Sequence, residues 1–295
     1  MYHARGLTVI KNQLKTILLL TSLSALLLLL GNLFGGTSGL YAAFIMALCM
    51  NSIAFFFSDR IVLAMYKAQP MDPQQYHSIY TTVQELTERM NLPMPKLWVI
   101  NSQMANAFAT GRNPHNASIA LTTSVIQHLD EYELRGVIAH ELGHIKNRDI
   151  LIATLAAVLA TTISYMAHMA YHFSFFASMS NNRRKANPIT LLVVAILTPM
   201  AASIIQLAIS RSREYLADET GAYHSQDPLA LASALEKLHR ISTESFTKAN
   251  DYRTSTASLF IVNPFTHKEF VTLFSTHPPV KNRIERLHRM NQKGF

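Results

Sequence analysis

The segment His140-Glu141-Leu142-Gly143-His144 decides how this sequence is interpreted. In an α-helix, residues i and i+4 lie one turn apart on the same face, so His140 and His144 can bind one zinc ion together. The carboxylate of Glu141 is then placed to take a proton from a water molecule on that metal. Two histidines on a helix surface are the alternative, but the apolar run 137–139 favours a buried helix. The segment therefore predicts a zinc-dependent hydrolase.

A catalytic zinc site needs a third protein ligand and keeps one position open for water. Glu214 and Asp218 are also spaced i and i+4, so they share a helix face. We expect Glu214 to be the third ligand and Asp218 to accept a hydrogen bond from the far nitrogen of a ligand histidine, which fixes its tautomer. This spacing alone is weak evidence, because it is common on solvated helices. Here, however, the pair follows directly after a long apolar hairpin, whose two ends would lie close together and bring Glu214 and Asp218 back to the helix of the histidines.

The composition excludes an ordinary soluble enzyme. Of the 295 residues, 49% are hydrophobic and 15% are charged, whereas roughly 25% are charged in a typical soluble protein. The net charge of +8, with no basic run longer than residues 183–185, favours basic loops beside a membrane and no nucleic-acid partner. The single cysteine, Cys49, excludes an intramolecular disulfide and a cysteine-based zinc cluster.

Long uncharged segments predict an integral membrane protein with the lipid bilayer as a partner. No charged residue lies between Thr16 and Ser58, about twice the ~20 residues of one span, and the glycine-rich residues 31–39 predict a turn in the middle. Later uncharged segments predict a second pair of spans. The four expected spans lie near residues 14–34, 39–58, 150–176 and 188–210. A cleaved signal peptide is disfavoured because no cleavage site follows the first apolar run promptly.

Lysine and arginine are distributed unequally about these spans. One side carries Arg5, Lys11, Lys15, Arg60, Lys67, Lys146, Arg148, Arg211 and Arg213, and the other carries only residues 183–185. The positive-inside rule therefore places the richer side in the cytoplasm. The expected organisation is an N-terminal hairpin (1–67), a first catalytic part (68–148), a second hairpin (149–210) and a second catalytic part (211–295).

The parts outside the spans predict a mainly α-helical domain with a small β-sheet. Helices are expected at 72–90, 130–147, 211–222, 228–243 and 280–290, with Asp130 as the N-cap of the second. Strands are expected at 97–100 and 117–122, which are rich in residues that favour β-structure. We expect both parts to fold together beside the membrane.

The sequence resembles the HtpX membrane metallopeptidases, relatives of the Ste-type CAAX prenyl peptidases, over essentially its whole length. The resemblance rests on four motifs in order: Asn106-Ala107-Phe108-Ala109-Thr110-Gly111, the segment 140–144 followed by Asn147-Arg148-Asp149, the segment 213–218, and the segment 273–279 with Arg283-Ile284. By position, the metal ligands of this family fall on His140, His144 and Glu214, and its catalytic glutamate falls on Glu141.

This resemblance implies a zincin-type endopeptidase with one Zn²⁺ per subunit. It further implies a multi-pass protein of the bacterial inner (cytoplasmic) membrane whose active site faces the cytoplasm, with a role in stress response and in quality control of misfolded membrane proteins. The implied partners are polypeptide substrates, mainly membrane proteins, and other quality-control proteases. Asn106, Ala107 and Phe108 would form the substrate-facing edge of the active-site sheet, unless they are an ordinary turn before a core strand.

Three further residues have less definite roles. Asn147 and Asp149 are expected simply to end the helix at the membrane boundary. His277 precedes two prolines that keep it out of helical geometry, which suits a second donor to the oxyanion formed during hydrolysis. It could instead pack the turn before the last helix, or occupy the fourth zinc position at rest.

Two rival functions fit parts of the sequence. A CAAX-type prenyl-protein peptidase would use the same chemistry, but about four spans leave little wall for a large intramembrane chamber. A non-enzymatic zinc-bound membrane scaffold would leave Glu141 without a task. A small transporter is disfavoured because no Asp, Glu or Arg lies inside the expected spans, and their one lysine, Lys15, lies at an end.

Overall fold

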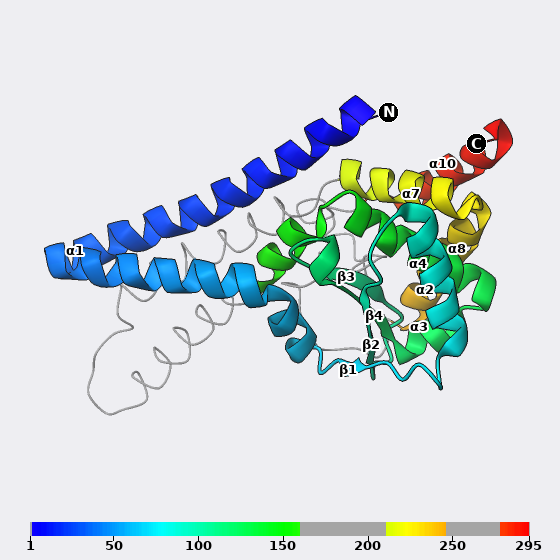
Figure 1. Cartoon of the computed structure of the whole chain (residues 1–295), viewed down its shortest axis with the longest axis horizontal. Coiled ribbons are helices and arrows are strands. Elements are labelled where there is room, and N and C mark those ends of the chain that lie inside the picture. The colour runs from blue at the N-terminus through cyan, green and yellow to red at the C-terminus, as the bar shows by residue number, and fades with distance from the viewer. Residues whose placement is uncertain (1, 160–210, 246–277, 295) are drawn as a thin grey trace.

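The structure is a computed structural model that describes residues 2–159, 211–245 and 278–294. A long helical hairpin is joined to a mixed helical and β unit (Figure 1). The elements are α1 (Tyr2–Met65), β1 (Gln69–Pro70), α2 (His77–Met90), β2 (Lys96–Ile100), β3 (Ala107–Gly111), a 3₁₀ turn (Pro114–Asn116), β4 (Ala117–Thr122), α3 (Thr123–His128), α4 (Glu131–Lys146), α7 (Arg211–Ser225), α8 (Pro228–Ser245) and α10 (Val280–Lys293).

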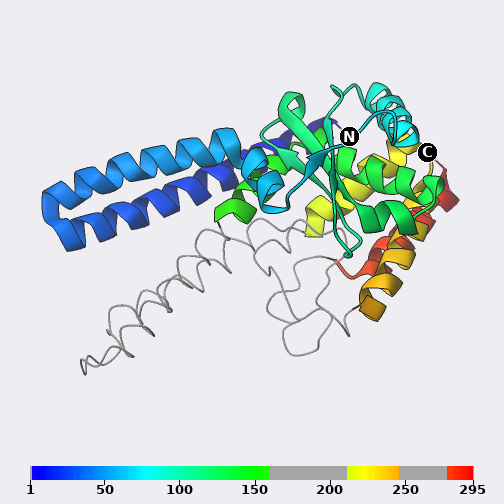
Figure 2. The same ribbon diagram turned by 90° about the horizontal axis from the view of Figure 1, so that it is seen from below.

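Element α1 consists of two helices that fold back on each other (Figure 2). They meet at Gly36, whose φ of 56° and ψ of −142° are not helical. Within the described residues, Gly35–Met65 is long and apolar enough to cross a membrane, and only 17% of its most apolar stretch is buried. Buried core helices and signal sequences can have the same length and composition, so the membrane assignment depends on the family relationship reported below.

The second predicted pair of spans falls largely on residues 160–210, outside the described residues. Its beginning is visible as an apolar helix, Ile150–Leu159. The described part of the chain therefore contains one helical hairpin with one candidate membrane span, and the count of four spans stays a prediction.

The sheet has four strands in the order β1-β2-β4-β3. Strands β2 and β4 are parallel, while β1 and β3 pair antiparallel with their neighbours. The expected strands at 97–100 and 117–122 are confirmed as β2 and β4. Residues 107–111 form β3 at the edge of the sheet, not a turn, and this edge is the one beside α4.

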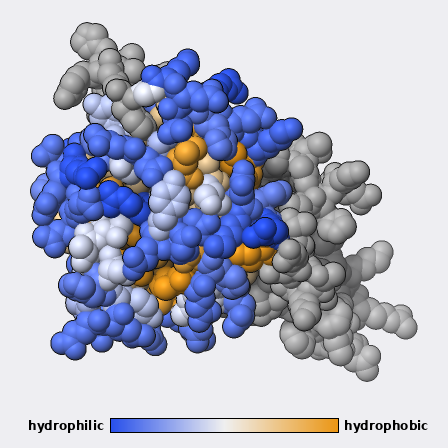
Figure 3. Space-filling view, turned by 90° about the vertical axis from the view of Figure 1, so that its right-hand side faces the viewer, coloured by the Kyte–Doolittle hydropathy of each residue, from blue (hydrophilic) through white to orange (hydrophobic). Residues whose placement is uncertain are grey.

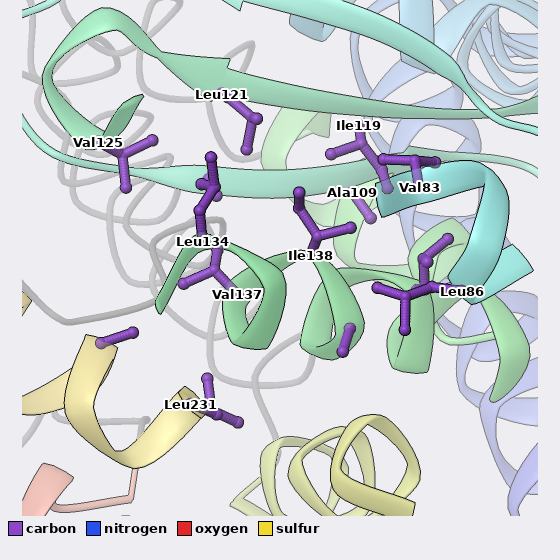
Figure 4. Packing of buried hydrophobic residues seen from close by; sticks show 14 of the residues in the cluster. Val83, Leu86, Ala109, Ile119, Leu121, Val125, Leu134, Val137, Ile138 and Leu231 are labelled. Carbon is purple, nitrogen blue, oxygen red and sulfur yellow. The ribbon is translucent and has the colours of Figure 1, made fainter. Parts of the chain in front are cut away.

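Helix α4 lies at the centre of the domain, with the sheet on one side and α8 on the other (Figure 4). Val137 and Ile138 are buried between Ile119 and Leu121 of β4 and Leu231 of α8. The apolar run before the two histidines therefore buries the helix, as the sequence predicts.

The ends of two helices differ in how well the sequence predicts them. The expected N-cap Asp130 accepts a hydrogen bond from the Glu133 N–H at 2.8 Å, and the Glu133 carboxylate accepts from the Asp130 N–H at 3.1 Å. The helix expected from residue 72 begins instead at His77. Asp72 precedes a proline, which disfavours helical geometry, and its carboxylate accepts from the Gln74 N–H at 2.9 Å in a local turn.

Helices α4 and α7 approach closely because glycines stand at their contact. A Cβ added to Gly143 of α4 would lie 2.7 Å from the Ala217 carbonyl oxygen, and one added to Gly221 of α7 would lie 2.8 Å from the Ala139 carbonyl oxygen. Both distances are shorter than any ordinary contact, so neither position accepts a side chain without separating the helices.

We expect Gly221→Ala to destabilise the protein by about 1–3 kcal/mol through this clash. Alanine is otherwise about 1 kcal/mol better than glycine inside a helix, so a loss of stability would come from the contact itself. The melting temperature of each variant measures the effect. Gly35→Ala is the matched control, because no atom lies within 4 Å of a Cβ added there. Equal melting temperatures for the two variants would contradict the close approach.

Candidate metal centre

The side chains of His140, His144 and Glu214 converge, with one ligand atom from each lying within 4.8 Å of the others. The two Nε2 atoms are 3.1 Å apart. The Glu214 carboxylate oxygens lie 3.7 Å from His140 Nε2 and 3.8 Å from His144 Nε2. Ligand atoms about 2.0–2.1 Å from a tetrahedral zinc are about 3.3–3.4 Å apart. The donor types and their spacing therefore fit a zinc ion.

Two helices supply these ligands in pairs. His140 and His144 lie one turn apart on α4, and Glu214 lies one turn before Asp218 on α7. Both pairs lie on one face of their helix, as the sequence predicts. The two faces contact each other where α4 packs against α7, so that His140 lies beside both Glu214 and Asp218. His140 is almost fully buried, whereas the side chain of His144 retains 17% exposure. The ring of His144 therefore lies nearer to solvent than the ring of His140.

Each imidazole is held by a carboxylate on its other nitrogen. His140 Nδ1 lies 2.9 Å from an oxygen of Asp218, and His144 Nδ1 lies 3.1 Å from both oxygens of Asp149. A carboxylate at Nδ1 keeps the proton on that atom and leaves Nε2 free to bind a metal. Asp218 therefore lies where the sequence places it.

Asp149 is a functional candidate whose position in the sequence indicates only the end of a helix. Helix α4 ends at Lys146, and Arg148 adopts a left-handed conformation with φ 55°. This turn brings the buried Asp149 back beneath the last helical turn, beside His144. The signal in the sequence is weak, since a carboxylate five residues after a histidine meets it only if the helix stops between them.

The pKa values of the two imidazoles shift in opposite directions. Burial lowers the pKa of His140 below its ordinary value, although the hydrogen bond that its ring donates to Asp218 opposes this. Burial also acts to lower the pKa of His144, but the Asp149 carboxylate outweighs it and raises that pKa to about 10. A more basic imidazole is a stronger metal ligand, and the metal must displace its proton to bind.

Arg283 of α10 fixes the position of Asp218. Its guanidinium donates from Nε to one Asp218 oxygen at 2.8 Å and from a terminal nitrogen to the other at 2.6 Å. A second terminal nitrogen lies 3.5 Å from a Glu214 oxygen. Burial would raise the pKa of Asp218, but Arg283 and His140 hold it below its ordinary value. Arg283 belongs to one of the sequence motifs, but the sequence indicates no role for it, because no local pattern links residues 65 positions apart.

Glu141 lies between the ligands and strand β3. Its side chain is buried, and its carboxylate accepts a hydrogen bond from the Ala109 N–H. Burial raises the pKa of Glu141 to about 8, against the attraction of the His144 ring. A carboxylate with this pKa can both take and release a proton near neutral pH.

The register of β3 determines which of its backbone groups face outward. The Asn106 carbonyl accepts from the Thr122 N–H at 3.0 Å. In an antiparallel pair such bonds recur at every second residue, so the backbone groups of Phe108 also face β4. Those of Ala107 and Ala109 face the outer edge, which pairs with no strand in the described part of the chain. The bond from the Ala109 N–H to Glu141 agrees with this alternation.

The three predicted substrate-binding residues therefore differ in position. Ala107 presents its backbone at the edge that no strand of the described residues occupies. Asn106 is buried and bonded to Thr122, and the Phe108 ring packs on the opposite face of the sheet, 5.3 Å from the Tyr66 ring. His277 lies outside the described residues, so its three possible roles stay predictions.

Comparisons with known proteins agree on one family. The sequence model of peptidase family M48 matches residues 73–291. The chain is 49% identical over 282 residues to the protease HtpX homolog of Syntrophobacter fumaroxidans, covering 95% of this chain and 99% of the relative. It is 45% identical over 283 residues to the protease HtpX homolog of Burkholderia ambifaria, covering 96% of this chain and 98% of the relative.

A solved structure, that of S. mikatae Ste24p, is similar over 95% of this chain and 66% of its own. Its sequence identity to this chain is 18% and the TM-score is 0.49.

We expect Asp149→Asn to weaken zinc affinity by about 10–100-fold, because the amide no longer fixes the tautomer or raises the basicity of His144. Competition with a chelator of known affinity measures this. Glu219→Gln is the matched control, since Glu219 is on the same helix as Asp218 but its side chain is 41% exposed and pairs with Arg286 at the surface. Unchanged affinity in Asp149→Asn would return Asp149 to a purely structural role.

Proposed function

The chain belongs to peptidase family M48, and from this membership we propose how its own residues carry out zinc-dependent peptide hydrolysis at a membrane. His140, His144 and Glu214 bind the zinc, and Glu141 is the general base. The observation that carries the proposal is the convergence of these three ligands, within 4.8 Å of one another, beside a buried glutamate. A zinc-bound scaffold would not need that glutamate there.

Zinc, when bound, polarises the peptide carbonyl and lowers the pKa of water. Glu141 accepts a proton from the attacking water and delivers it to the nitrogen of the leaving amine. The bond from the Ala109 N–H keeps its carboxylate directed at the reaction site. Asp218 and Asp149 hold the two imidazoles in the tautomer that binds the metal, and Arg283 holds Asp218.

The free edge of β3 supports binding of an extended polypeptide. The outward N–H and carbonyl of Ala107 and the outward carbonyl of Ala109 can pair with a substrate strand, as an added strand does at any sheet edge. Binding of this kind uses main-chain groups, which all sequences share. We therefore propose an endopeptidase that accepts many unfolded polypeptides, not an enzyme for one short C-terminal motif such as a CAAX peptidase.

We propose that the protein is a multi-pass protein of the bacterial inner membrane with its active site in the cytoplasm. The bacterial HtpX relatives, the apolar hairpin of α1 and the unequal distribution of lysine and arginine support this. The organisation then follows the expected ranges 1–67, 68–148, 149–210 and 211–295, with four spans. Misfolded membrane proteins are the proposed substrates, in quality control together with other proteases.

The surface opposite the hairpin supports this arrangement. Seen from the end of the domain that lies farthest from the hairpin tip, the surface is mostly hydrophilic, with only small apolar areas (Figure 3). A domain that faces the cytoplasm on that side would have such a surface.

We expect Glu141→Gln to keep zinc and to lose cleavage by about 10²–10⁴-fold, the typical contribution of a general base. Zinc content of the purified protein and hydrolysis of casein measure the two effects separately. Glu219→Gln, at the surface, should retain both. Near-normal hydrolysis by a zinc-loaded Glu141→Gln protein would remove Glu141 from the mechanism.

Labelling of engineered cysteines tests the orientation. In a Cys49→Ala background, a membrane-impermeant reagent added outside the cell should label Ser38→Cys, which is exposed close to the hairpin tip, and should not label Ser212→Cys, which is exposed at the start of α7. Both should react once the membrane is permeabilised. Labelling of Ser212→Cys in intact cells would reverse the proposed orientation.

A further inference from the structure

The hairpin of α1 marks a membrane boundary on the side of the catalytic domain. Counted from Gly36, the first charged residue is Lys15 in one arm and Asp59 in the other, 21 and 23 residues away. At about 1.5 Å per residue these lengths are about 32 and 35 Å, close to the ~30 Å thickness of the hydrocarbon core. If Gly36 lies at the far surface, the near surface lies next to Asp59.

The turn between β3 and β4 contacts α1 at this boundary. The guanidinium of Arg112 lies 5.3 Å from the centroid of the Phe56 ring, and that of Arg60 lies 5.6 Å from the Phe57 ring. Phe56 follows Gly36 by 20 residues, or about 30 Å of helix. Both guanidiniums therefore lie at the level of lipid phosphates, where basic side chains bind anionic headgroups.

A second apolar helix places the membrane surface at the same height. The helix Ile150–Leu159 begins directly after the charged Asp149. Its Thr154 hydroxyl accepts a hydrogen bond from the Gly111 N–H at 3.3 Å and lies 3.0 Å from the Thr110 hydroxyl. The end of β3 therefore lies beside the first turns of an uncharged helix as well as beside the end of the uncharged part of α1.

From the membrane surface, β3 and the last turns of α1 extend side by side into the catalytic domain. Residue numbers fall along β3 in this direction and rise along α1. Arg112 lies beside Phe56, whereas Phe108 packs in one cluster with Val62 and lies 5.3 Å from the Tyr66 ring. At about 3.3 Å per residue, Ala109 is about 10 Å from Arg112. The Ala109 N–H donates to the Glu141 carboxylate, so the reaction site is also about 10 Å from the membrane surface.

We propose that this protease selects bonds by their distance from the membrane, cleaving an anchored polypeptide within about ten residues of the point where it leaves the bilayer. About three to four residues of extended chain bridge 10 Å, and a less direct path accounts for the remainder. Arg112, stacked on Phe56, acts as a positioning residue that holds β3 at the lipid phosphates. The inference rests on the proposed function and adds the substrate class, a juxtamembrane segment.

The test uses full-length enzyme in vesicles that contain anionic lipid, together with a reporter that has one membrane span and an unstructured cytoplasmic tail. The tail repeats one short cleavable sequence, so that every position offers the same side chains. Mass spectrometry of the fragments locates the cuts. We expect at least about tenfold more cuts in the first ten residues after the span than in any later stretch of equal length, as expected when tethering holds only that stretch at the site.

The same tail, released as a soluble peptide, separates this inference from the proposed function. Wild-type enzyme should cut the free peptide evenly along its repeats, and Glu141→Gln should not cut it. Even cutting of the anchored tail, together with cutting of the free peptide, would overturn the distance rule and leave the protease assignment intact. If wild-type enzyme cut neither substrate, both the proposed function and the distance rule would be wrong.

Arg112→Ala tests the positioning residue. The ratio of anchored to free cleavage should fall about fivefold in anionic vesicles, the effect of about 1 kcal/mol expected for one basic residue at such a surface. Arg289→Ala is the matched control, because its side chain is 68% exposed on α10, the helix at the end of the molecule opposite the hairpin tip (Figure 1). A ratio that is equal in both variants would exclude the proposed role of Arg112.

Discussion

The close contact between α4 and α7 is the constraint on which the catalytic centre depends. Each helix carries its functional residues one turn apart, so a single contact brings His140 and His144 to Glu214 and Asp218. The contact is possible because neither Gly143 nor Gly221 has a side chain to separate the backbones. A carboxylate displaced by one ångström would leave hydrogen-bonding distance of its imidazole. The glycines therefore contribute to metal binding without touching the metal.

The same contact buries more charge than a protein interior usually accepts. Among the described residues around the site, four carboxylates are buried, those of Glu141, Asp149, Glu214 and Asp218, and two guanidiniums are buried with them, those of Arg213 and Arg283. Buried charges are costly unless they are compensated. The Asp149 carboxylate raises the pKa of His144, so a metal ion that binds this imidazole replaces a proton and keeps a positive charge among the carboxylates. Metal binding should therefore stabilise the fold as well as supply the chemistry.

How much of this could be predicted from the sequence depends on the range of the interaction. Features set within one helical turn were predictable: the histidine pair of α4, the Glu214–Asp218 pair and the cap at Asp130. Contacts that depend on tertiary structure were not. Arg283 reaches Asp218 from another helix, and Asp149 reaches His144 only because the chain reverses at Arg148. The sequence likewise indicates apolar segments of sufficient length, but it does not show that the end of one of them packs against the active-site sheet.

That packing connects anchoring with catalysis. Val62 and Leu63, near the end of α1, are buried with Phe108 and Ala120 of the sheet, so the hairpin and the sheet form one packed unit. An edge strand recognises the main chain, which offers little discrimination among sequences. A protease built on such an edge needs another source of selectivity, because specificity is always a difference between affinities. Fixing the edge strand against the anchoring helix supplies one, since it limits which parts of a substrate reach the site, whatever their side chains. Broad sequence tolerance and restricted choice of substrate are then compatible in one enzyme.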